Sequence, residues 1–146
     1  MNGKINNDVR ERNVIESFYI DQEKKTVHSD LFDGKAQEIA KNIIGVTTNQ
    51  LRRIYDEVKS IEPKLNSIAF EELEPYIRMI KVKARYNIAR VKNKRNEKAY
   101  KYLTSFINEG IGEVKNKKDF YVFLSLFEAV YGFYFEFEKN SIKEER

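Results

Sequence analysis

The sequence predicts an all-α protein, a compact bundle of about five helices, and three observations lead to this fold class. Apolar residues recur at alternating spacings of three and four along several segments, which is the pattern of helices with one buried face. Strand signals are weak, and no Asn-Gly or Asp-Gly pair separates two alternating runs. The 146 residues, of which 41% are hydrophobic, provide one sizeable core but not two.

The regular apolar pattern begins only at Asp33. We therefore assign residues 1–32 to a flexible or loosely structured N-terminal extension and residues 33–146 to the helical bundle domain. Within the extension, a short helix is expected at about residues 13–20.

The first two expected helices are defined by their ends. Asp33 is positioned to cap the first helix, and Gly45 lies just past its end, where a left-handed residue is favoured. Thr47 or Thr48 then caps the second helix, which ends at Pro63. Their inward-facing residues are Ala36, Ile39, Ala40 and Ile43 in the first helix, and Leu51, Ile54, Val58 and Ile61 in the second.

The third expected helix covers residues 70–91 and is the longest of the five. The fourth covers residues 97–109 and is ended by Gly110 and Gly112, and the fifth runs from a cap at Asp119 to about residue 138. The inward-facing residues are Leu73, Ile77, Ile80, Ala84, Ile88 and Val91, then Tyr100, Leu103 and Ile107, then Phe120, Phe123, Phe127, Val130, Tyr134 and Phe137.

Composition excludes several kinds of site. The absence of cysteine excludes disulfides, thiolate zinc sites, cysteine nucleophiles and iron–sulfur clusters, and the single histidine, His28, cannot form a histidine metal site. No P-loop, dinucleotide-binding or metalloprotease motif is present. We therefore expect no enzyme, no cofactor and no metal. With no secretory signal and no apolar run near the ~20 residues of a membrane helix, a cytoplasmic protein is expected.

Positive charge is concentrated in the third expected helix, although the whole chain carries only +4. Between Pro75 and Asn96 there are eight basic residues and no acidic one. At 100° per residue, two basic stripes flank a second, narrower apolar stripe that contains Met79, Val82 and Tyr86. One basic stripe consists of Arg78, Lys81, Arg85 and Lys92, and the other of Lys83, Arg90 and Lys94.

Such a surface suits nucleic acid, because phosphates need cations at intervals and tyrosines such as Tyr86 stack on bases. The alternative is a solvated helix whose cations have no partner, but a helix of that kind usually carries Glu–Lys pairs. The second helix adds Arg52 and Arg53, for which intrahelical ion pairs with Asp56 and Glu57 are the alternative interpretation.

Three segments of the chain form a distinctive set. They are residues 48–58 (TNQLRRIYDEV), residues 75–90 with KVKARYNIAR at 81–90, and residues 117–134 (KKDFYVFLSLFEAVYGFY). This set resembles the small helical subunit of type III-A CRISPR effector complexes, the Csm type. Their order, their spacing and the short all-α chain make the set more specific than any one segment.

The resemblance implies a non-catalytic role in antiviral defence. Copies of this subunit stack in the complex, contact the guide and target RNA backbone without reading its sequence, and touch the backbone subunits and the large signalling subunit. The RNA-binding residues implied by the matching segments are Arg52, Arg53, Lys81, Lys83, Arg85 and Arg90, and the basic stripe adds Arg78.

Other interpretations remain open from the residues alone. A helical protein–protein adaptor would direct the same basic stripes at an acidic partner surface. A helical DNA-binding regulator would need a sharp helix-turn-helix, for which only the turn at Gly45 is a candidate.

Overall fold

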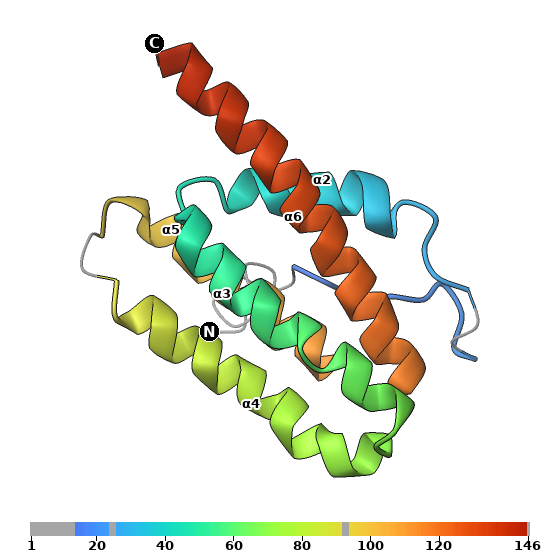
Figure 1. The fold of residues 1–146 in the computed structure, drawn as a ribbon. Coiled ribbons are helices and arrows are strands. Elements are labelled where there is room, and N and C mark those ends of the chain that lie inside the picture. The colour runs from blue at the N-terminus through green and yellow to red at the C-terminus, as the bar shows by residue number, and fades with distance from the viewer. Residues whose placement is uncertain (1–13, 24–25, 92–93, 146) are drawn as a thin grey trace, which may run out of the picture.

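Five α-helices form a bundle in the computed structural model, which describes residues 14–23, 26–91 and 94–145 (Figure 1). The α-helices are α2 (Ala36–Asn42), α3 (Thr48–Lys59), α4 (Phe70–Ala89), α5 (Glu97–Gly112) and α6 (Lys117–Glu145). The shorter helical turns are η1 (Leu31–Lys35), η2 (Glu62–Asn66) and η3 (Lys94–Asn96). Within the described residues the only β-type pairings are isolated bridges. The all-α prediction is confirmed.

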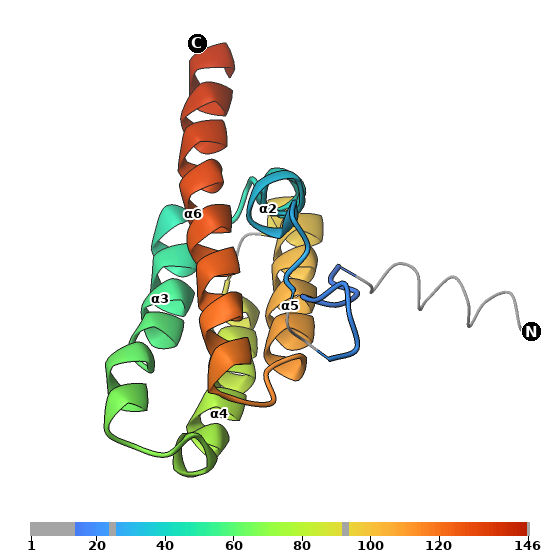
Figure 2. The same ribbon diagram turned by 90° about the vertical axis from the view of Figure 1, so that its right-hand side faces the viewer.

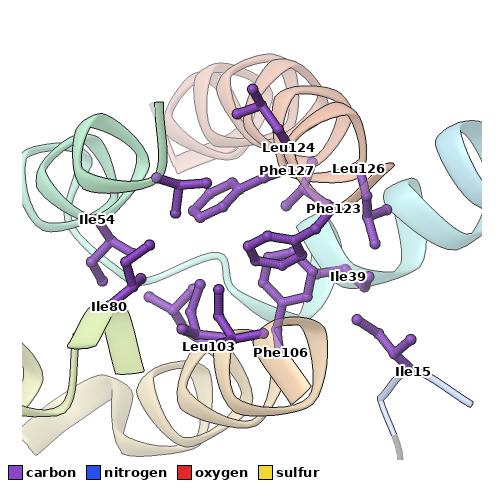
Figure 3. Packing of buried hydrophobic residues seen from close by; sticks show 14 of the residues in the cluster. Ile15, Ile39, Ile54, Ile80, Leu103, Phe106, Phe123, Leu124, Leu126 and Phe127 are labelled. Atoms are coloured by element: carbon purple, nitrogen blue, oxygen red, sulfur yellow. The ribbon is translucent and has the colours of Figure 1, made fainter. Parts of the chain in front are cut away.

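Helix α6 packs against α2, α3 and α5, whereas α4 packs against α3 and α5. Phe123 and Phe127 of α6 point toward Phe106 of α5, with ring centroids 5.8 and 5.4 Å from that of Phe106 (Figure 3). All three side chains are fully buried, and a buried aromatic side chain contributes a large share of the hydrophobic stabilisation. The surrounding core side chains come from every other helix and include Ile39, Ile54, Ile80 and Leu103.

The length of α6 differs from the prediction. It has 29 residues, so it and not α4 is the longest helix, and its C-terminal part extends past the other helices (Figures 1 and 2). Among the described residues, α6 is also the one helix long and apolar enough to cross a membrane. Its predicted inward residues from Phe120 to Tyr134 are nevertheless buried in the protein core, as in the central helix of a bundle.

Asp119 does not cap α6, contrary to the prediction. Asn116 does so, because its Oδ1 accepts a hydrogen bond from the Asp119 N–H at 2.9 Å. Asp119 is instead fully buried, and its carboxylate accepts hydrogen bonds from the Lys115 N–H and the Tyr19 hydroxyl. A buried carboxylate with these partners fixes the start of α6 against the N-terminal segment.

Two further helix ends differ from the prediction. The first helical segment begins at Leu31 with a π-type turn, so Asp33 lies inside it, and the Asp33 carboxylate accepts a hydrogen bond from Gln37. Helix α5 continues through Gly110 to Gly112. Gly110 is required for close packing instead, since a Cβ at this position would lie 2.2 Å from the ring of Phe123.

The segment 14–23 belongs to the core although it contains no helix. The helix expected at residues 13–20 is wrong over the described residues, which form bends and one bridge residue. Val14, Ile15, Phe18 and Tyr19 are nevertheless buried. The Ile15 N–H donates to Glu109 of α5 at 2.9 Å, which supplies from a side chain the acceptor that a helix would have supplied.

The link from α2 to α3 fixes where α3 begins. Gly45 has a φ of 111°, so the predicted left-handed residue is confirmed. A Cβ there would lie 2.7 Å from Asn96, whose amide donates a hydrogen bond to the Gly45 carbonyl. The cap of α3 is Thr47, because its hydroxyl accepts a hydrogen bond from the Gln50 N–H at 3.2 Å.

Candidate nucleic-acid interface

Helices α3 and α4 lie side by side and antiparallel (Figure 1). Their apolar stripes turn inward, and the buried residues are Leu51, Ile54 and Val58 in α3, and Leu73, Ile77, Ile80 and Ala84 in α4. Helix α4 also packs against α5. The predicted basic residues of the two helices therefore fall on three different surfaces. These are the flank of α3 that faces α6, the flank of α4 that faces α5, and the flank of α4 that faces α3.

Arg52 lies on the flank of α3 that faces α6. Its guanidinium lies 3.5 Å from the hydroxyl of Tyr131, and this hydrogen bond raises the pKa of Arg52. Lys59 on the same flank contacts Glu128 of α6 at 3.0 Å and Glu62 at 3.0 Å. The ion pair between Arg52 and Asp56, the alternative interpretation of Arg52, is not among those formed in the described part of the chain.

Arg78 lies on the flank of α4 that faces α5. Its guanidinium donates to the backbone carbonyls of Ile111 and Val114, both at 2.6 Å, and pairs with Glu74 at 2.6 Å. These carbonyls belong to the end of α5 and the residues after it, where a helix carries partial negative charge, and the Ile111 carbonyl also accepts a hydrogen bond from the Val114 N–H. Arg78 thus links α4 to the end of α5 through hydrogen bonds and has a structural role.

Lys81 and Arg85 follow Arg78 by about one and two helical turns and share its flank. Arg85 is exposed and Lys81 is partly buried. Neither has a hydrogen bond or ion pair with another described residue, so both charges remain available. Lys92 lies outside the described residues.

The flank of α4 that faces α3 brings together two predicted arginines. Arg53 of α3 and Arg90 at the end of α4 line a pocket of about 110 Å³ with Gln50 and Asn87, hereafter the α3–α4 pocket. Arg53 has no hydrogen bond or ion pair with another described residue. The guanidinium of Arg90 lies 5.4 Å from the ring centre of Tyr86, a cation–π contact that leaves its N–H groups free for an anion.

A larger pocket of about 320 Å³ adjoins the α3–α4 pocket and shares Asn87 with it. Its other lining residues are Glu57, Val82, Lys83 and Tyr86, and we call it the Tyr86 pocket. Lys83 pairs with Glu57 at 3.1 Å. This contact between helices takes the place of the alternative Arg53–Glu57 pair and leaves Arg53 without a counter-charge.

The narrow apolar stripe of α4 faces away from the core. The exposed fractions are 66% for Tyr76, 45% for Met79, 55% for Val82 and 61% for Tyr86. An unpaired row of large apolar side chains along one helix typically marks a contact surface. Here it runs between the two basic flanks of α4.

The sequence interpretation missed Gln50 and Asn87. Both are amides within one helical turn of a predicted arginine, Gln50 before Arg53 and Asn87 before Arg90, and this spacing was the available signal. Together the groups of the two pockets can bind an anion, hydrogen-bond a neutral polar group and stack on a flat ring. Among the described residues, no group of three or more His, Asp or Glu side chains is positioned to hold a metal ion.

Comparison with known proteins identifies the family. A family model described as Csm2 Type III-A matches residues 26–140, which is most of the chain and includes α2 to α5 and nearly all of α6. Neither the curated proteins nor the solved structures with which the chain was compared include a match. The chain therefore belongs to the Csm2 family, the small subunit of the type III-A CRISPR effector complex.

Proposed function

We propose that this subunit is non-catalytic and binds the backbone of guide and target RNA in a cytoplasmic effector complex that acts in antiviral defence. Several copies stack beside the backbone subunits and touch the large signalling subunit. The family match supports the place in the complex, and the finer contacts are proposed from the surface of α3 and α4.

The observation that carries this proposal is the α3–α4 pocket, where two arginines from different helices meet without a carboxylate between them. Cations of this kind are normally neutralised by a partner, and phosphate is a partner that two guanidinium groups bind well. Arg53 and Arg90 are the principal proposed contacts. Lys81, Lys83, Arg85 and Arg52 are secondary ones, and Arg78 is left out because its guanidinium is bonded to carbonyls.

Contacts of this type are made to phosphates, so sequence is left to base pairing between guide and target. The helix geometry adds to the attraction. Gln50 lies in the first turn of α3, where the helix dipole gives a partial positive charge that favours an anion, although its own N–H is bonded to the Thr47 hydroxyl.

A second candidate function is a protein–protein adaptor that binds an acidic partner surface. The exposed row of Tyr76, Met79, Val82 and Tyr86 favours it, because RNA backbone does not require an apolar surface. The two functions are compatible within one assembly, since stacked copies need protein contacts as well as RNA contacts.

Purification of the tagged full chain from its host tests both functions. We would sequence the RNA that is retained and identify the proteins, for the parent and for Arg90→Glu. Lys64→Glu is the matched control, because Lys64 is an exposed cation in η2, outside both pockets. Arg90→Glu should lose most of the RNA, with the protein still folded by circular dichroism, whereas Lys64→Glu should retain it.

Discrete guide RNAs together with several complex subunits support the proposed function. Heterogeneous RNA that is removed by moderate salt, together with one acidic partner protein, would favour the adaptor instead. Equal RNA retention by the parent and Arg90→Glu would remove the α3–α4 pocket from the interface.

A further inference from the structure

The α3–α4 pocket contains an unsatisfied hydrogen-bond acceptor as well as two cations. The side-chain oxygen of Gln50, Oε1, is buried and has no hydrogen-bond partner in the described part of the chain. Buried polar atoms in folded proteins are nearly always paired. Gln50 is one of the four residues that line the pocket, so a turn of its side chain toward the pocket would give this oxygen a partner from outside the chain. That partner must be a donor, because a carbonyl oxygen can only accept.

Gln50 is held in position by its own backbone. Its N–H is bonded to the hydroxyl of Thr47, and the next residue, Leu51, is fully buried in the core. The side chain therefore starts from a fixed point in the first turn of α3. The neighbouring polar groups of the pocket do not satisfy it, although Arg53, Asn87 and Arg90 all carry N–H donors.

The combination of groups restricts the ligand. Two guanidinium groups select an anion, and the Gln50 oxygen selects a neutral donor beside that anion. A phosphodiester with an adjacent ribose offers both, because the 2′-hydroxyl can donate a hydrogen bond, and deoxyribose lacks this group.

The sizes of the two pockets agree with this assignment. A volume of about 110 Å³ holds an edge of the sugar–phosphate backbone but not a whole nucleotide. The adjoining Tyr86 pocket, about 320 Å³, has an exposed aromatic ring on which a base can stack. At its far side Glu57 is paired with Lys83, so the net positive charge lies with Arg53 and Arg90.

We propose that the α3–α4 pocket recognises the ribose 2′-hydroxyl through Gln50 while Arg53 and Arg90 bind the neighbouring phosphate, so that this subunit distinguishes RNA from DNA. The inference rests on the proposed function and adds to it a specific reading of the sugar. One hydrogen bond of this kind corresponds to roughly a 2- to 10-fold preference in affinity.

The test is fluorescence anisotropy of the full chain with four single strands of one base sequence: RNA, DNA, 2′-O-methyl RNA and 2′-fluoro RNA. The 2′-fluoro strand keeps the sugar pucker of RNA but has no hydroxyl donor. We expect RNA to bind roughly 2- to 10-fold more tightly than the other three. Gln50→Met should weaken RNA binding to the level of DNA and leave DNA binding unchanged.

Gln37→Met is the matched control, because it removes the same amide from α2 and should keep the preference for RNA. Equal binding of RNA and 2′-fluoro RNA by the parent would overturn the inference without any variant. So would an unchanged preference in Gln50→Met.

Arg53→Met separates this inference from the proposed function. If it weakens RNA and DNA alike while the parent shows no preference, the phosphate contact holds and the recognition of the 2′-hydroxyl fails. If it changes neither affinity, the proposed RNA interface itself is wrong.

Discussion

The two flanks of α4 carry the same residue types and use them differently. On the α5 side, Arg78 donates to two backbone carbonyls and a carboxylate, whereas on the α3 side Arg90 meets another arginine and a tyrosine ring. The neighbouring helix end explains the difference. The end of α5 presents carbonyl acceptors, and the start of α3 presents N–H donors. A cation is therefore structural or available for a ligand according to which helix end faces it.

The largest expected effect is on stability at the α5 flank. Arg78→Met should lower the free energy of unfolding by about 2 kcal/mol, because two carbonyls of the α4–α5 junction lose a charged donor. Urea denaturation followed by circular dichroism measures it. RNA affinity of the folded variant should change little.

Arg85→Met is the control for this prediction, since Arg85 shares the flank but is exposed and has no partner among the described residues. It should change stability by less than about 0.5 kcal/mol. Equal stability losses in the two variants would mean that the hydrogen bonds of Arg78 to the end of α5 do not stabilise the fold.

The next effect is on RNA affinity and compares the flanks directly. The double variant Arg53→Met/Arg90→Met and the double variant Lys81→Met/Arg85→Met each remove two positive charges. The first should weaken RNA binding by about tenfold, because it removes both guanidinium groups of the α3–α4 pocket. The second should weaken it only a few-fold, through the general field.

Filter binding over a range of salt concentrations measures both variants. Fewer phosphate contacts make affinity less sensitive to salt, so the slope of log affinity against log salt concentration should decrease more in the first variant than in the second. Equal losses would indicate that net charge alone matters and that the pocket has no special role.

Helix periodicity was sufficient to predict the bundle and most of the inward residues of α3, α4, α5 and α6, but it missed Phe106, which is fully buried and whose ring contacts those of Phe123 and Phe127. It could not predict which acidic or basic residue would pair across two helices. Arg53 and Glu57 are one helical turn apart, yet Glu57 pairs with Lys83 of α4, because antiparallel packing brings that ammonium group within 3.1 Å. Only the relative placement of two helices decides such a choice.

The N-terminal segment shows a second limit of the sequence pattern. Phe18 is fully buried and stacks on Phe123 with ring centroids 6.5 Å apart, but its segment has neither helical nor strand periodicity. The partly buried carboxylate of Glu109 and the fully buried carboxylate of Asp119 accept the hydrogen bonds that hold it. Long-range contacts between a side chain and an irregular backbone leave no periodic signature, so residues 14–19 could not be assigned to the core from the sequence.

The smallest expected effect concerns the carboxylate beside the pocket. Glu57→Gln releases Lys83 and removes a negative charge from the Tyr86 pocket, so RNA affinity should rise about 2- to 3-fold at low salt, with stability changed by less than about 0.5 kcal/mol. Glu128→Gln is the matched control, because Glu128 is paired with Lys59 on the opposite flank of α3. If both variants raise the affinity equally, the gain comes from net charge. If only Glu57→Gln raises it, the phosphate path passes between α3 and α4, and Glu57 limits how tightly this flank can bind RNA.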